Sequence, residues 1–117
     1  MFSYEKINHN LDYKKSWVSF YFNNPQSISE GVTVENHLGQ KTIFQTCLLP
    51  DDPDFIEPGE VNCKNKKVTK SQTLNIDAGI KEKWTFDVPD IPGKYWILAE
   101  YMENGQDTVK YLSFVKK

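Results

Sequence analysis

The sequence predicts an all-β protein, folded as an antiparallel sandwich of seven to eight strands in one domain over residues 1–117. Apolar and polar residues alternate with a period of two in several segments, and turn-forming residues separate those segments at short intervals. No segment of ten residues shows the helical period. A chain of 117 residues suits a single core, and an aromatic content of 14% can fill it.

The alternation is clearest in residues 13–22, which read Y-K-K-S-W-V-S-F-Y-F. One face of this strand carries Val18, Phe20 and Phe22, and the other carries Trp17, Ser19 and Tyr21. The turn-forming run 23–25 ends the strand. A short strand at 2–7 would precede it, which explains the range of seven to eight.

Two further strands are expected at residues 29–35 and 41–49. Residues 36–39, which read Asn-His-Leu-Gly, form a turn signal between them. We therefore expect these two strands to pair with each other as a hairpin.

The second half of the chain supplies four strands, at residues 73–76, 83–88, 94–103 and 107–115. The strand at 94–103 is the most apolar of the four. Asn104-Gly105 lies between the last two strands, and both residues tolerate the positive φ of a tight hairpin turn. The last two strands are therefore expected to pair.

The segment 84–101 resembles the end of a bacterial immunoglobulin-like sandwich. Its Pro92-Gly93-Lys94-Tyr95 run is similar to the tyrosine corner, in which a tyrosine hydroxyl anchors the preceding crossover. Antibody-type domains carry a disulfide cysteine two residues later, where this chain has Ile97. The resemblance therefore implies an immunoglobulin-like architecture without the antibody disulfide, and structural roles for Trp84 and Tyr95.

The same segment is similar to the bacillar intracellular proteinase inhibitor (BsuPI) family. That family pairs a tryptophan-containing strand with a Pro-Gly-x-Tyr turn and a final hairpin. Trp84, Val88-Pro89, Pro92-Gly93 and Tyr95 resemble this layout, and the match covers roughly the last third of the chain. The resemblance implies that the chain inhibits a subtilisin-type protease.

No cofactor and no catalytic site are predicted. The cupredoxin fold has a similar Pro-Gly-x-Tyr turn, but copper needs cysteine and histidine ligands, and the corresponding residues 99–101 are Ala-Glu-Tyr. His9 and His37 lack the companions that a zinc site requires. The sequence also contains no nucleophile elbow and no glycine-rich phosphate loop, so we expect a protein that is not an enzyme.

The two cysteines, Cys47 and Cys63, lie at the ends of the segment C-L-L-P-D-D-P-D-F-I-E-P-G-E-V-N-C. Three prolines interrupt regular structure there, and a disulfide would restrict the segment to few conformations. We predict a Cys47–Cys63 disulfide. It favours an extracytoplasmic protein, secreted or membrane-anchored through a removed signal, whereas two free thiols would indicate the cytoplasm.

This segment is also the predicted surface for a protein partner, through Asp52, Asp54, Phe55 and Ile56. Phe55 and Ile56, together with Leu48 and Leu49, would supply an apolar contact. A loop closed by a disulfide loses little entropy on binding. Calcium is an alternative ligand for the acidic side chains of this segment. Their spacing does not match an EF-hand, and no metal site is predicted.

Three aromatic residues outside the predicted core pattern, Trp17, Tyr21 and Trp96, suggest another alternative, a carbohydrate-binding module. Nucleic acid is not expected as a partner, because the net charge is −2 and all 14 basic residues are lysines. No apolar run is long enough for a transmembrane segment. The leading prediction is a non-catalytic protein-interaction module of a bacterial secreted protein or lipoprotein, with the proteinase inhibitor and the carbohydrate-binding module as alternatives.

Overall fold

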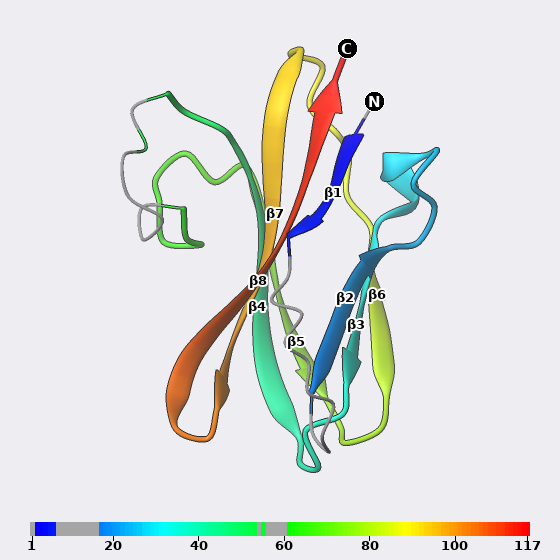
Figure 1. Ribbon diagram of the computed structural model, residues 1–117, viewed down its shortest axis with the longest axis vertical. Coiled ribbons are helices and arrows are strands. Elements are labelled where there is room, and N and C mark those ends of the chain that lie inside the picture. Colours follow the sequence, from blue (N-terminus) through cyan, green and yellow to red (C-terminus); the bar gives the residue numbers. More distant parts are fainter. Residues whose placement is uncertain (1, 7–16, 54, 56–60) are drawn as a thin grey trace.

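The computed structural model describes residues 2–6, 17–53, 55 and 61–117. Within these residues the chain forms eight strands and one short 3-10 helix (Figure 1). The strands are β1 (Phe2–Lys6), β2 (Val18–Phe22), β3 (Val32–Asn36), β4 (Thr42–Pro50), β5 (Lys70–Ile76), β6 (Lys81–Trp84), β7 (Gly93–Glu103) and β8 (Gln106–Lys116). The 3-10 helix, η1, covers Ile28–Glu30.

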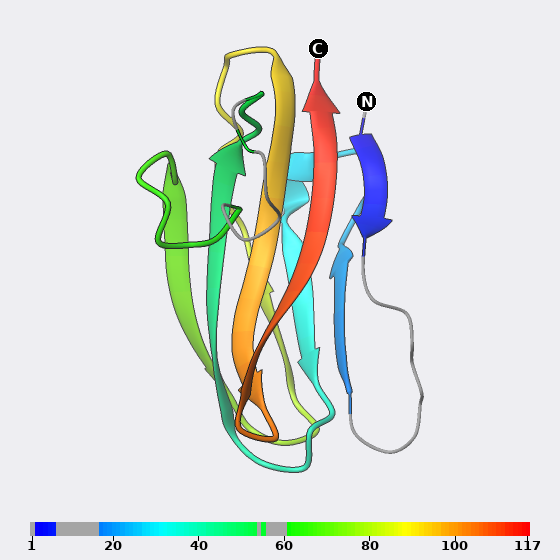
Figure 2. The same cartoon turned by 60° about the vertical axis from the view of Figure 1, so that its left-hand side comes forward.

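The strands form two antiparallel sheets that pack face to face (Figure 2). The larger sheet has the order β1-β8-β7-β4-β5, and the smaller has the order β2-β3-β6. With β2 to β8 taken as strands A to G, the sheets are A-B-E and G-F-C-D, which is an immunoglobulin-like arrangement with strand D in the second sheet. The predicted fold class is confirmed.

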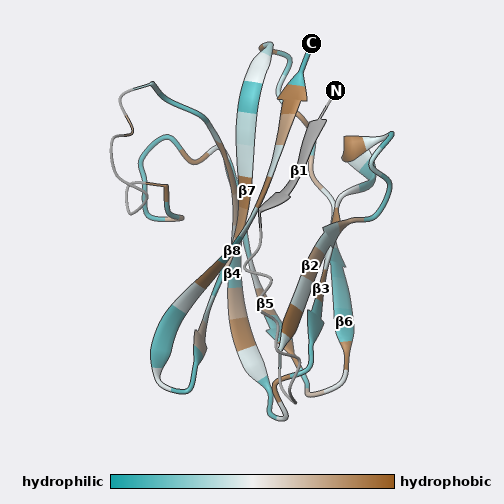
Figure 3. Cartoon of the chain, in the orientation of Figure 1, coloured by the Kyte–Doolittle hydropathy of each residue, from teal (hydrophilic) through white to brown (hydrophobic). Residues whose placement is uncertain are grey.

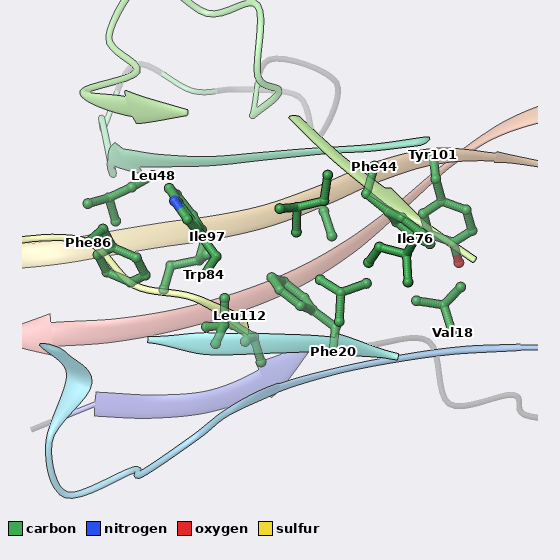
Figure 4. Packing of buried hydrophobic residues seen from close by; sticks show 14 of the residues in the cluster. Val18, Phe20, Phe44, Leu48, Ile76, Trp84, Phe86, Ile97, Tyr101 and Leu112 are labelled. Carbon is green, nitrogen blue, oxygen red and sulfur yellow. The ribbon is translucent and has the colours of Figure 1, made fainter. Parts of the chain in front are cut away.

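The core lies between the two sheets, where the inward side of every strand from β2 to β8 contributes (Figure 4). Apolar and polar bands alternate along the strands, as the period of two requires (Figure 3). The fully buried core residues of largest volume include three phenylalanines, Phe20, Phe44 and Phe114. Trp84 and Tyr95 are also buried, at 7% and 3% exposure, which confirms their predicted structural roles.

The hairpin of β7 and β8 forms as predicted. Asn104 and Gly105 both have positive φ, at 53° and 77°, and Glu103 pairs with Gln106 across the turn. This geometry matches the twist of the flanking strands, which is why Asn-Gly is favoured there.

The tyrosine corner is present where β6 crosses over to β7. The hydroxyl of Tyr95 donates a hydrogen bond of 2.5 Å to the carbonyl oxygen of Ile91. The ring of Tyr95 stacks on Phe114, with centroids 5.3 Å apart. Because its ring lies in the core and its hydroxyl binds the crossover, Tyr95 fixes the point at which the chain enters the larger sheet.

The expected hairpin of residues 29–35 with 41–49 is wrong. β3 and β4 belong to different sheets, because β3 pairs with β2 and β6 while β4 pairs with β5 and β7. The turn at 36–39 carries the chain from one sheet to the other instead of reversing it within one sheet. The turn signal was real, but a turn signal does not say which strands pair.

Asn36, the last residue of β3, holds this sheet-to-sheet corner. Its side chain is fully buried, and its amide nitrogen donates to the carbonyl oxygens of Gln40, at 2.9 Å, and Ile76, at 2.8 Å. Its amide oxygen accepts a hydrogen bond from the backbone N–H of Leu38. One side chain therefore links β3 of the smaller sheet to β5 of the larger sheet.

The strand expected at 83–88 is shorter in the structure and starts earlier. β6 ends at Trp84, and the chain then crosses to the other sheet through residues 85–92. Phe86 is still buried, and its ring lies 4.7 Å from that of Trp84. The alternation of apolar residues therefore predicted burial in the core correctly, even for Phe86, which lies beyond the last residue of β6.

Candidate functional site

The outer face of the larger sheet, turned away from β2, β3 and β6, is apolar in its middle. On β4, Cys47 and Leu49 point outward and are fully buried, while Leu48 between them belongs to the core. On β7, the outward Leu98 is likewise fully buried. Something must therefore cover this part of the outer face.

The cover comes from the 19-residue connection 51–69 between β4 and β5, of which residues 51–53, 55 and 61–69 are described (Figures 1 and 2). These described residues fold back over the sheet and form a second apolar cluster with it, which we call the outer cluster. Its members are the buried Cys47, Leu49, Val61 and Leu98, with the partly buried Phe55, Cys63, Val68, Trp96, Val109 and Tyr111 packed against them.

The predicted disulfide joins Cys47 of β4 to Cys63 of the connection, with Cα atoms 5.6 Å apart. The backbone N–H of Cys63 also donates a hydrogen bond of 2.8 Å to Glu100 on β7. At its end, the N–H of Thr69 donates to the carbonyl oxygen of Leu48, at 2.9 Å. The connection is thus tied to the sheet by one covalent bond and at least two hydrogen bonds.

Charged groups add further ties. Lys67 Nζ lies 2.6 Å from Asp52 Oδ2, and the indole N–H of Trp96 donates to Asp51 Oδ1 at 2.9 Å. The acidic first half of the connection is followed by a basic second half, with lysines at 64, 66 and 67, and Lys70 begins β5 directly after it. This pairing was not predicted from the sequence, although four lysines within residues 64–70 were a visible signal.

The predicted partner-binding residues have distinct positions. Phe55 is half-buried and packs against the outer cluster, and Asp52 binds Lys67. Asp54 and Ile56 lie outside the described residues. Leu48 and Leu49 cannot supply an apolar contact to a partner, because both are 0% exposed within β4; that expectation is wrong.

Burial also affects the ionisable groups beneath the connection. Burial raises the pKa of the Tyr111 phenol, and the nearby Glu100 carboxylate raises it further.

Among the described residues, no group of three or more His, Cys, Asp or Glu side chains is arranged to hold a metal ion. The described part of the chain also contains no helix of the length and hydropathy needed to cross a bilayer.

The outer face of the smaller sheet is polar and aromatic. Trp17 and His37 lie opposite each other and exchange backbone hydrogen bonds, and their rings stack with centroids 4.3 Å apart. His37 Nε2 lies 2.9 Å from Glu35 Oε1, and the Tyr21 hydroxyl donates to Glu35 Oε2. We call these four residues the aromatic ladder.

The hydrogen bonds of the aromatic ladder shift two pKa values in opposite directions. The hydrogen bond from Tyr21 holds the pKa of Glu35 below its ordinary value, and His37 and Lys81 act in the same direction. The same hydrogen bond raises the pKa of Tyr21, because it favours the protonated phenol. Trp96, grouped with Trp17 and Tyr21 from the sequence, lies on the other sheet.

Comparisons with protein-family models, with curated proteins and with solved structures find no match to this chain. The resemblance to the BsuPI family therefore stays a prediction.

Proposed function

We propose that the protein is a non-catalytic protein-interaction module of a bacterial secreted protein or lipoprotein, and that it binds its partner through the connection 51–69. The observation that carries this proposal is the way in which a long connection is fastened to a rigid sheet. Loops positioned by a rigid scaffold are common binding elements.

The fastening matters because a flexible loop loses conformational entropy when it binds. Here the disulfide, the Cys63–Glu100 hydrogen bond and the Asp52–Lys67 pair restrict the described residues of the connection before any partner arrives. A partner therefore meets a preorganised surface, which favours affinity. Cys47 is fully buried beneath this surface, while Lys64 and Lys66 are exposed on it.

The disulfide also supports the proposed compartment. Disulfides persist in oxidising environments and are rare in the cytosol of most organisms. Cys47 is fully buried, so a reductant reaches this bond only from the side of Cys63. A stable structural disulfide agrees with a protein that works outside the cytoplasm.

A proteinase inhibitor of the BsuPI type is the second candidate, and it would use the same preorganised loop. Inhibition of a subtilisin-type protease by the native protein, lost on reduction of the disulfide, would favour this candidate. Unchanged protease activity at saturating concentrations of the protein would exclude it for that protease.

The proposal is tested by site-specific photocrosslinking in the extracytoplasmic fraction of the source cells. A photoreactive residue at Lys66, in the connection, is compared with the same residue at Lys83, on the smaller sheet. The captured protein is then purified, and its affinity for the native and the reduced module is measured. A partner that crosslinks only from position 66, and binds more weakly after reduction, supports the proposal; equal capture from both positions contradicts it.

A further inference from the structure

The aromatic ladder belongs to a continuous polar surface that the proposed function does not use. The strand register places Ser19 between Trp17 and Tyr21 on β2, and it places Glu35 beside Lys81 on the edge strand β6. Thr33 lies beside Lys83 in the same way. Outward side chains from three neighbouring strands thus form one surface, with Trp17 and His37 at one end.

Trp17 has an unusual combination of exposure and fixed orientation. Its residue surface is 41% exposed, yet its ring is stacked on His37 at an interplanar angle of 24°. His37 is held by Glu35, and Glu35 is held by Tyr21. A chain of three interactions therefore fixes an exposed indole, which is how a binding site presents a preorganised contact.

The rest of the surface excludes two common kinds of partner. Protein interfaces concentrate apolar side chains at a centre that loses its water, but the exposed centre here is the Glu35 carboxylate. Nucleic acid is favoured by an uninterrupted cluster of basic side chains, whereas Lys81 and Lys83 here lie beside the Glu35 carboxylate and the buried Thr33. An exposed aromatic ring beside fixed polar groups suits a ligand with both apolar faces and hydroxyl groups.

We infer that the outer face of the smaller sheet binds a neutral polysaccharide chain. The apolar face of a pyranose ring would stack on Trp17, and hydroxyl groups further along would reach Glu35 and Lys81. The Glu35 carboxylate accepts one hydrogen bond on each oxygen from the protein, so each oxygen retains a lone pair for a ligand hydroxyl. Tyr21 acts as a positioning residue through Glu35.

The ligand is tested by titration calorimetry with cellohexaose, chitohexaose, xylohexaose and maltohexaose. We expect at least one of them to bind, and Trp17→Ala to weaken that binding by about tenfold or more. Tyr21→Phe keeps the ring but releases Glu35, so it should weaken binding by less and shift the pH dependence of affinity upward. Met102→Ala is the matched control, because Met102 is 52% exposed on the other sheet.

Three results would overturn the inference: no binding of any of the four sugars, equal affinity of the Trp17→Ala variant, or binding only of polygalacturonate, a polyanion. Melting temperatures show that the variants are folded. The inference is independent of the proposed function, because the two surfaces lie on opposite sides of the sandwich. A variant that lacks the disulfide but stays folded should keep its affinity for the sugar.

Discussion

The two outer faces of the sandwich are built on the same alternation but end in opposite environments. On the larger sheet, the outward residues Leu49 and Leu98 are buried under the connection 51–69. On the smaller sheet, the corresponding outward residues are Tyr21 and Glu35, which remain partly exposed and bind each other. A strand covered on both sides needs apolar residues at every position, whereas a strand with one open face does not.

The difference between the two outer faces is therefore visible in the sequences of their strands. The sequence 95–99 of β7, Tyr-Trp-Ile-Leu-Ala, is continuously apolar, while β2 alternates. A continuous apolar run within an antiparallel sheet predicts that a second layer covers its outer face. Here that layer is the connection 51–69, whose described residues form no strand and which a disulfide holds to the sheet.

The largest expected effect comes from removing the fastening of the covered face. Cys47→Ala with Cys63→Ala should lower the free energy of unfolding by about 3 to 5 kcal/mol, because the unfolded chain gains freedom and the buried Cys47 sulfur is lost. Urea denaturation measures this change. A loss below about 1 kcal/mol would show that the outer cluster holds the connection without the disulfide.

The next effect separates covered from uncovered positions on one strand. Leu98 and Met102 both point outward from β7, but Leu98 is 0% exposed and Met102 is 52% exposed. Leu98→Ala should cost about 3 kcal/mol because it leaves a cavity, and Met102→Ala should cost less than about 0.5 kcal/mol. Similar losses for both variants would mean that the connection does not shield Leu98 in solution.

A smaller effect is expected at the tyrosine corner, which lies between the two sheets and belongs to neither outer face. Tyr95→Phe removes only the hydroxyl that binds the Ile91 carbonyl oxygen, so stability should fall by about 1 kcal/mol. Thermal unfolding measures this change. The measured loss gives the stabilisation from one side-chain hydrogen bond, for comparison with the larger losses on the covered face. An unchanged melting curve would contradict a role for the corner.

The smallest effect is expected on the open face, and it depends on pH. The pKa of Glu35 is lowered in the folded protein, so its stabilisation is present above its ordinary pKa of 4.5 and is lost as the pH falls through the lowered value. Glu35→Gln removes this dependence. Because Glu35 is partly exposed, the difference should be at most about 0.5 kcal/mol. Urea denaturation between about pH 5 and 3 measures it, and parallel stability curves for both proteins would contradict it.

Local signals allowed much of the fold to be predicted. Asn104-Gly105 specified its hairpin because both residues accept positive φ, and the Pro-Gly-Lys-Tyr run specified the corner at Tyr95. The Cys47–Cys63 disulfide followed from the composition between the cysteines. Each of these features depends on residues near one another in the sequence.

Features that depend on distant residues were harder to predict. The turn at 36–39 was recognised, but the pairing of β3 with β2 and β6 depends on the whole arrangement of the sheets. The stacking of Trp17 on His37 requires the register of two strands. The cover over Leu98 could have been inferred from the continuous apolar run in β7, because such a run predicts burial on both faces of the strand.

The position of Asn36 has a consequence for how the protein unfolds. Its buried amide donates to carbonyl oxygens on both the corner and β5, so it is satisfied only while both sheets are in place. An intermediate with one intact sheet would leave this amide without its Ile76 partner, at a cost of about 1 to 3 kcal/mol where water is excluded. Such an intermediate is therefore poorly populated, and the two sheets are expected to melt in one cooperative transition, with coincident curves from fluorescence and circular dichroism.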